Sequence, residues 1–167
     1  MRRLGEILIE QGTIAPRQLE EALGKQKREP GKLLGQVLIE LGYVTEEDIV
    51  VALATQFNIP YLPIANFSVD EKVKKLMPPE LVRKHNCLPV DKFGNIFTVV
   101  ISDPTNEEAI HEIERVTQCK VQLFVSTVSE ISNMIQQLFG QSAESTASHS
   151  SHLAPDLKSK TQNSFNP

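Results

Sequence analysis

The chain has 167 residues, of which 40% are hydrophobic and 23% are charged, and its formal net charge is −4. This composition is typical of globular proteins, and the net negative charge argues against broad binding to the phosphates of DNA or RNA. The apolar runs are far shorter than the ~20 residues that cross a bilayer, and the N-terminus has no apolar stretch of the signal-peptide kind. We therefore expect a cytoplasmic protein that does not insert into membranes.

An internal repeat occupies the first third of the chain. Residues 4–26 align without gaps on residues 34–56, and both copies begin with Leu-Gly and end with glutamine. The apolar spacing of each copy predicts a short helix, a glycine after its end and a longer helix. Pro16 suits the first turn of one longer helix, and Thr45 before three acidic residues is typical of an N-cap. One copy cannot bury its own apolar faces, so residues 1–58 should form a four-helix module.

The pattern changes at residue 59, where short β-like runs begin to alternate with helical runs. The expected strands are 61–64, 88–91, 96–102 and 121–126, and the expected helices are about 69–76, 79–86, 105–117 and 128–139. Ser68 with Glu71, and Thr127 with Glu130, form capping-box patterns at two helix starts. The sequence thus predicts an α+β fold, in which the tandem helical module precedes a small, sandwich-like α/β module with a mixed sheet over residues 59–140.

The histidines show no metal-binding pattern. Residues 141–167 are rich in serine and other small polar residues, which predicts a disordered tail. His149 and His152 lie in this tail without a strong third ligand, so chance composition is the favoured interpretation. His85 and His111 each stand alone in a polar helical context, and we expect both at the surface.

No motif of an enzyme is present. The sequence contains no phosphate loop, no G-x-G-x-x-G, no G-x-S-x-G and no H-E-x-x-H, which predicts a non-enzymatic protein without a cofactor. Cys87 and Cys119 lack CxxC spacing and are expected to be reduced thiols in the core. Asp103 and Thr105 follow a predicted strand, where ligands often bind in α/β proteins, but capping of the next helix is the favoured interpretation.

Several features of the repeat go beyond the needs of a core. Arg3 stands directly before the first Leu-Gly, and Gln26 and Gln56 occupy matched positions inside an apolar stripe, which suggests a shared partner. Gly5 and Gly35 lie within helical patterns, where glycine costs about 1 kcal/mol relative to alanine, so another surface should approach the backbone there. A neighbouring helix or a bound ligand would each explain the glycines, and packing is the favoured of the two.

The segments RLGEILIEQGTI and LLGQVLIELGYV, the helices LEEALGKQ and IVVALATQ, and FNIPYL after them resemble the MshEN domain of bacterial type II secretion and type IV pilus assembly ATPases. The resemblance covers about residues 3–140. It implies that cyclic di-GMP is the ligand, a two-fold symmetric dinucleotide of which each copy takes one half. The family's motif places Arg3, Leu4, Gly5, Leu8, Leu19, Leu23 and Gln26 around one half, and Leu34, Gly35, Leu38, Ile49, Leu53 and Gln56 around the other.

The chain departs from this family in two ways. Leu33 stands where the second copy matches Arg3, so one arginine of the pair is missing, and Lys32 is the candidate substitute. The ATPase motor of the family is also missing from this chain. We therefore expect a sensor or adaptor for cyclic di-GMP that signals by contact with a protein partner of secretion or pilus machinery, with the α/β module as the docking surface. The alternative is a docking protein with no nucleotide site.

Overall fold

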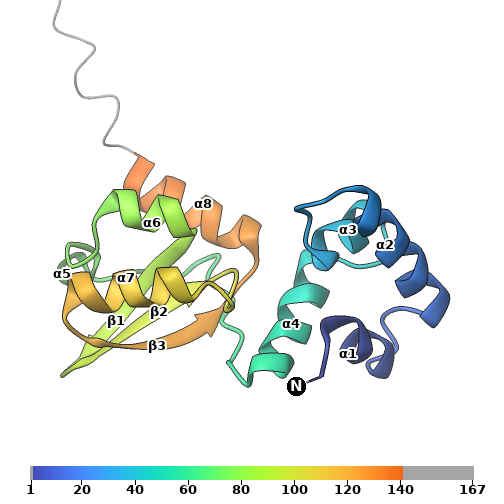
Figure 1. Cartoon of the computed structure of the whole chain (residues 1–167). Coiled ribbons are helices and arrows are strands. Elements are labelled where there is room, and N and C mark those ends of the chain that lie inside the picture. The colour runs from blue at the N-terminus through green and yellow to red at the C-terminus, as the bar shows by residue number, and fades with distance from the viewer. Residues whose placement is uncertain (1, 141–167) are drawn as a thin grey trace, which may run out of the picture.

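The structure of the protein is a computed structural model that describes residues 2–140. Within this range the chain forms eight helices and one three-stranded mixed sheet, which confirms the predicted α+β fold. The helices of the repeat lie at one end of the molecule and the sheet with its covering helices lies at the other (Figure 1). None of the described helices is long and apolar enough to cross a membrane. The predicted disordered tail falls outside the described residues.

Each copy of the repeat forms one short and one long helix, as expected. These are α1 (Leu4–Glu10), α2 (Pro16–Arg28), α3 (Leu34–Glu40) and α4 (Glu46–Phe57). Gly12 and Gly42 follow the short helices with φ of 73°, a left-handed conformation that glycine adopts without strain. Pro16 begins α2, and the Thr45 hydroxyl accepts a hydrogen bond from the N–H of Asp48 at the start of α4. The sequence signals at these ends are therefore confirmed.

The two copies share one core. Helix α1 packs against α4 and α2 packs against α3, so the short helix of each copy contacts the long helix of the other. The buried side chains of this core form four matched pairs, which are Ile7 and Val37, Leu8 and Leu38, Ile14 and Val44, and Ala22 and Ala52. The two members of each pair occupy equivalent positions of the repeat. Together with the crossed contacts of the helices, this gives the module an approximate internal two-fold symmetry.

The α/β module is built on strands β1 (Cys87–Phe93), β2 (Ile96–Ile101) and β3 (Lys120–Val125), in that order across the sheet. Strand β1 is antiparallel to β2, and β2 is parallel to β3. The helices are α5 (Glu71–Lys74), α6 (Pro79–His85), α7 (Glu107–Thr117) and α8 (Val128–Phe139). Helix α7 lies along the sheet, while α6 and α8 pack above it (Figure 1). Cys87 and Cys119 are free and buried, which confirms the prediction of core thiols.

Two local predictions in this module are wrong. Residues 61–64 form no strand, and Tyr61 makes only an isolated bridge to Val125 of β3. Pro60 directly precedes this segment and Pro63 lies within it, and neither has an N–H to extend the pairing. Helix α5 begins at Glu71, and its cap is the Asp70 carboxylate, so the expected Ser68 capping box does not form. Asp70 lies directly before the first turn of α5. Its charged carboxylate is a stronger acceptor for the free N–H groups of that turn than the hydroxyl of Ser68.

Candidate functional site

A cavity of about 330 Å³ lies between the helical module and the α/β module. Its helical wall consists of Leu4 from α1, Leu33, Leu34, Gly35, Gln36 and Ile39 from the start and body of α3, and Glu46, Ile49, Val50 and Leu53 from α4. Its other wall consists of residues that follow β2 and β3, namely Ser102, Asp103, Thr105, Ser126, Thr127 and Val128. One wall is mostly apolar and the other mostly polar, and the volume is within the range of small-molecule sites.

Asp103 is the acidic residue of the polar wall. Its Oδ1 accepts hydrogen bonds from the backbone N of Thr105 at 2.9 Å and from the Thr105 hydroxyl at 2.6 Å. Asn106, rather than Asp103 or Thr105, caps α7, because its side chain accepts from the N–H of Ala109. Within residues 2–140, Asp103 Oδ2 has no hydrogen-bond partner, so this half-buried oxygen is available to a ligand. The favoured prediction of capping is not met by Asp103, and its position shortly after β2 is the feature that had suggested a ligand.

Five of the predicted ligand-binding residues line the cavity: Leu4, Leu34, Gly35, Ile49 and Leu53. Leu8 and Leu38 do not line it, because both are fully buried in the helical core. Gly5, Leu19 and Leu23 are the first-copy residues matched to Gly35, Ile49 and Leu53 of the cavity wall. None of the three lines the cavity: Gly5 is buried, Leu19 is half-buried and Leu23 is 38% exposed.

The two glycines lie against the long helices of their own copies. A Cβ atom added to Gly5 would lie 2.6 Å from Leu19 Cδ1, and one added to Gly35 would lie 3.2 Å from Ile49 Cγ2. Both distances are shorter than ordinary van der Waals contact between carbon atoms. Close helix packing, the interpretation favoured from the sequence, is therefore present at both positions.

The two glutamines make equivalent hydrogen bonds to the backbone. Gln26 Nε2 donates to the carbonyl oxygen of Lys32 at 2.9 Å, and Gln56 Nε2 donates to that of Arg2 at 3.0 Å. Each accepting carbonyl lies just before the N-cap of a short helix in the other copy. The matched glutamines thus hold the starts of α3 and α1 in place, and neither lines the cavity.

The two predicted cations, Arg3 and Lys32, differ in their surroundings. Arg3 is exposed, and its guanidinium has no hydrogen-bond or ion-pair partner within residues 2–140. Lys32 Nζ lies 2.7 Å from Glu29 and 2.7 Å from Glu40, and these two carboxylates raise the pKa of Lys32. Lys32 repeats the role of the matched residue Arg2, which pairs with a glutamate of α1. The structure does not bring Lys32 to the cavity, whereas Leu33, 59% exposed, lines it.

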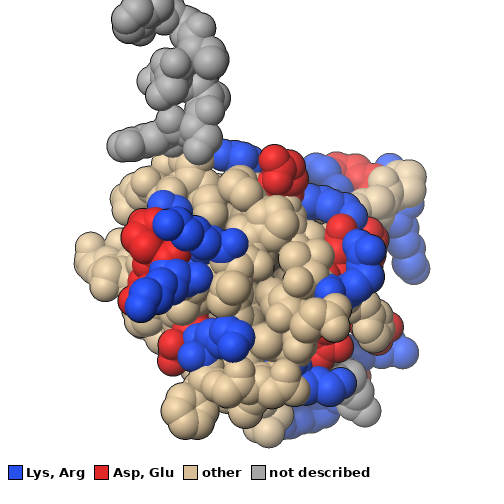
Figure 2. Space-filling view, turned by 90° about the vertical axis from the view of Figure 1, so that its left-hand side faces the viewer, with Lys and Arg blue, Asp and Glu red and all other residues tan. Residues whose placement is uncertain are grey.

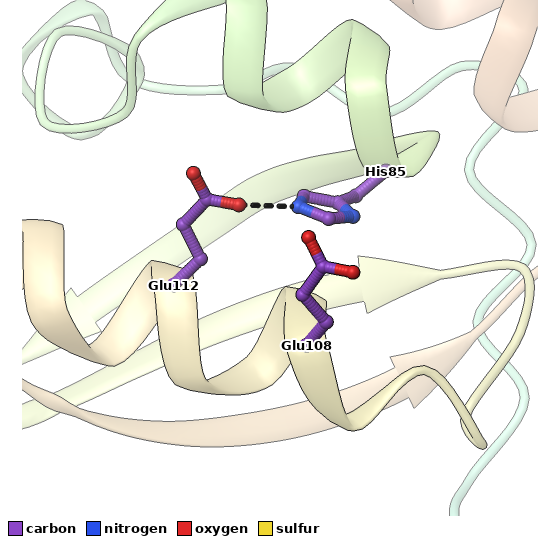
Figure 3. Close-up of side chains that lie close together, drawn as sticks. All are labelled: His85, Glu108 and Glu112. Atoms are coloured by element: carbon purple, nitrogen blue, oxygen red, sulfur yellow. Dashed lines mark hydrogen bonds and ion pairs between the residues drawn. The ribbon is translucent and has the colours of Figure 1, made fainter.

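A second group of polar side chains joins α6 to α7 (Figure 3). His85 points from the end of α6 toward Glu108 and Glu112, which project from successive turns of α7. His85 is only 7% exposed, so the prediction of a surface histidine is wrong, whereas His111 is exposed as expected. The i, i+4 spacing from buried Leu81 to His85 was the overlooked signal that this side chain faces inward.

Hydrogen bonds among the side chains of this group account for their close approach without a metal ion. His85 Nε2 lies 2.7 Å from Glu112, and Lys84 Nζ lies 2.9 Å from both Glu108 and Glu112. The amide of Asn106 faces His85 Nδ1 at 3.4 Å, which favours the tautomer that donates from Nε2 to Glu112. His85 and Lys84 together lower the pKa of Glu112 to about 2. Both carboxylates thus already have hydrogen-bond partners on α6, and the group is a structural tie between two helices.

Comparison with known proteins decides the family. The model of the MshEN domain family matches residues 57–145, just over half of the chain. The chain belongs to the MshEN domain family. The matched range covers the α/β module described above, and the tandem helical module precedes it.

Curated relatives of this MshEN chain are type IV pilus assembly ATPases named PilB. The protein from Myxococcus xanthus is 26% identical over 164 residues, which cover 96% of this chain and 29% of that protein. The protein from Thermus thermophilus is 31% identical over 130 residues, which cover 77% of this chain and 14% of that protein. The chain thus spans less than a third of the length of these relatives.

Solved structures show that the similarity includes both modules. A structure of MshE with cdg is 26% identical and has a TM-score of 0.74, covering 82% of this chain and 99% of that one. The N-terminal domain of XpsE shares the fold at 23% identity, with a TM-score of 0.65 and coverage of 81% of this chain and 92% of that one. Because 82% of the chain is more than residues 59–140 alone, the matched fold extends into the tandem helical module.

Proposed function

We propose that this MshEN protein is a cytoplasmic, non-enzymatic sensor or adaptor for cyclic di-GMP that passes its signal through protein contacts. The observation that carries this proposal is the cavity, because one of its walls is the second copy of the repeat and the first copy presents the matched surface. A two-fold symmetric dinucleotide can place one half on each copy, beside the matched residues Leu4 and Leu34, which both line the cavity. The similar fold of MshE, solved with cdg, supports the choice of ligand.

The chemistry of the residues suits a guanine dinucleotide. Leu34, Ile49 and Leu53 offer apolar contacts for the faces of base and ribose in the cavity. Asp103 offers a carboxylate oxygen that can accept from the N–H groups of a guanine edge. On the first copy, Arg3 offers a planar guanidinium for a phosphate or a guanine edge, and no existing ion pair has to break before it binds.

The proposal places the signal in protein contacts rather than in nucleotide turnover. The curated relatives are named as assembly ATPases, but the chain matches 29% of the length of the protein from Myxococcus xanthus. We propose that the matched part binds the nucleotide and that a separate partner of secretion or pilus machinery responds. Incubation with ATP, GTP and cyclic di-GMP should leave all three nucleotides intact, and measurable turnover would contradict this part of the proposal.

Isothermal titration calorimetry of the intact chain with cyclic di-GMP tests the binding claim. We expect binding heat for the native protein and weaker binding for Arg3→Ala. Arg2→Ala is the matched control, because Arg2 is the neighbouring arginine but is paired with Glu10. Gln56→Ala should also weaken binding, since Gln56 holds the backbone beside Arg3. Absence of heat from the native protein would refute the sensor function, and equal affinities of the two arginine variants would refute the assignment of Arg3.

A docking protein without a nucleotide site is the second candidate function. Phe93 is 84% exposed at the tip of the β1–β2 hairpin, and its cross-strand partner Ile96 is 45% exposed. The hairpin tip points away from the helical module (Figure 1). The face at this end carries charges of both signs around a broad uncharged area (Figure 2). If Phe93→Asp abolishes binding to a purified pilus or secretion component while the native protein gives no heat with cyclic di-GMP, docking is the better description.

A further inference from the structure

One carboxylate connects the two modules directly. Glu46, in the first turn of α4, accepts a hydrogen bond from the backbone N of Ser129 at 3.0 Å through Oε2. Its Oε1 accepts a second hydrogen bond from the Ser129 hydroxyl at 2.9 Å. No other hydrogen bond or ion pair joins residues 2–57 to residues 62–140 in the structure. We call this pair of contacts the Glu46–Ser129 tie.

The neighbouring acidic residues of α4 have other surroundings. Asp48 completes the capping box of α4, since it accepts from the N–H of Thr45 at 2.8 Å while its own N–H donates to the Thr45 hydroxyl at 3.2 Å. Glu47 is exposed and has no hydrogen-bond partner among residues 2–140. The three acidic residues that look equivalent in the sequence therefore differ, and Glu46 alone reaches α8.

The tie lies at the edge of the cavity. Glu46 lines the helical wall, and Thr127 and Val128, which directly precede Ser129, line the opposite wall. The two walls are otherwise connected through the chain at residues 58–61, where Pro60 accepts from the N–H of Val125 and so fixes the linker to β3. Asn58 has a left-handed φ of 53° at the end of α4. Without the Glu46–Ser129 tie, this linker and apolar packing would be the remaining connections across the cavity.

We propose that Glu46 is a positioning residue that sets the separation of the two cavity walls and thereby the affinity for the ligand. The choice of cyclic di-GMP as that ligand rests on the proposed function. The sign of the effect is informative, because the ligand is an anion and a carboxylate in the wall repels it. Removal of Glu46 lowers this repulsion, yet the proposal requires that removal weakens binding, since the walls no longer hold the spacing that fits the ligand.

The first experiment needs no ligand. Spin labels are attached at Arg28→Cys on α2 and Glu107→Cys on α7, both exposed positions, and the distance between them is measured by electron paramagnetic resonance. The buried native thiols should take up no label, which the unsubstituted chain checks. A single narrow distance distribution is expected with native Glu46 and with Glu47→Ala. Glu46→Ala should broaden it while circular dichroism remains native, and an unchanged narrow distribution would overturn the proposal.

The second experiment measures affinity by titration calorimetry with cyclic di-GMP. Glu46→Ala should weaken binding by roughly tenfold, which equals about 1.4 kcal/mol. Glu47→Ala removes the same charge one residue away and should leave the affinity unchanged or slightly higher. Ser129→Ala should have a smaller effect than Glu46→Ala, because the backbone N of Ser129 still donates, and the double variant should lose less than the sum of the two. Tighter binding by Glu46→Ala would overturn the proposal.

The two experiments separate this inference from the proposed function. If the native chain binds no cyclic di-GMP, the proposed function fails, while the distance measurement still decides whether Glu46 sets the separation of the modules. If the native chain binds and Glu46→Ala binds equally well with an unchanged distance distribution, the ligand assignment stands and the positioning role is refuted.

Discussion

Replacement of Leu33 by arginine should increase the affinity for cyclic di-GMP. Leu33 occupies the position matched to Arg3, lines the cavity and is 59% exposed. Full burial of a leucine side chain contributes about 1.5–3 kcal/mol, so exposure of the remaining two-fifths costs about 1 kcal/mol of folding stability at most. The apolar stem of the new arginine offsets part of this cost. The variant should therefore fold with nearly native stability.

The gain in affinity follows from the new charge. A hydrogen bond to a charged group contributes about 1.5–3 kcal/mol, and solvent exposure at the rim of the cavity reduces this to about 1 kcal/mol, or roughly fivefold in affinity. Titration calorimetry compares the native chain, Leu33→Arg and the control Gln11→Arg, which adds the same charge at the exposed end of α1. Unchanged affinity in a folded Leu33→Arg variant, or an equal gain in the control, would refute a paired-arginine site.

Three further outcomes concern stability and reactivity. In urea titrations, Gly5→Ala should lower the free energy of unfolding by about 1–3 kcal/mol and Gly35→Ala by less than about 1 kcal/mol. The reason is that the added Cβ would lie 2.6 Å from Leu19 in the first copy but 3.2 Å from Ile49 in the second. Equal losses for the two variants would contradict this difference in packing. The pKa of Glu112 is about 2, so its stabilising effect, present above pH 4.5, should fade as the pH falls toward 2. The unfolding free energies of native protein and Glu112→Gln should therefore converge over that range, and a constant difference would contradict the ion pair. Burial raises the pKa of Cys87 to about 12, so its thiol should resist iodoacetamide at pH 8 until the protein is unfolded, and rapid alkylation of the folded chain would contradict its burial.

The tandem module could be predicted from the sequence because its rules are local. Pro16, Thr45, Gly12 and Gly42 define the ends of helices through their own backbone and capping preferences. The apolar stripes defined the core, whose buried pairs are matched positions of the repeat. The predicted strand at 61–64 failed because periodicity says nothing about a pairing partner, and Pro60 before the segment and Pro63 within it lack the N–H that a strand ladder needs.

The candidate site could be predicted only in part because its walls come from distant parts of the chain. The repeat pointed to Leu34, Ile49 and Leu53, but nothing local indicates that Asp103 faces them. The pattern also showed that the matched glutamines are equivalent without showing their partners, which are carbonyl groups of the other copy. Matched polar residues in a repeat can therefore serve either a shared ligand or a shared backbone contact. For Gln26 and Gln56 the hydrogen bonds in the structure show the backbone contact.

The α/β module breaks the symmetry of the repeat, and this asymmetry determines where a signal can originate. A ligand shifts an equilibrium between arrangements only by as much as it binds them differently. Under the proposed function, ligand atoms beside Arg3 and Leu23 of the first copy would contact the helical module alone, so their binding would not depend on the position of the α/β module. Ligand atoms in the cavity would contact α3 and α4 together with the residues after β2 and β3, so under the proposed function this half of the ligand would bind one arrangement of the modules better than another. In a sensor of this architecture, the first copy, which does not face the α/β module across the cavity, would contribute affinity. The second copy, which does face it, would contribute the response.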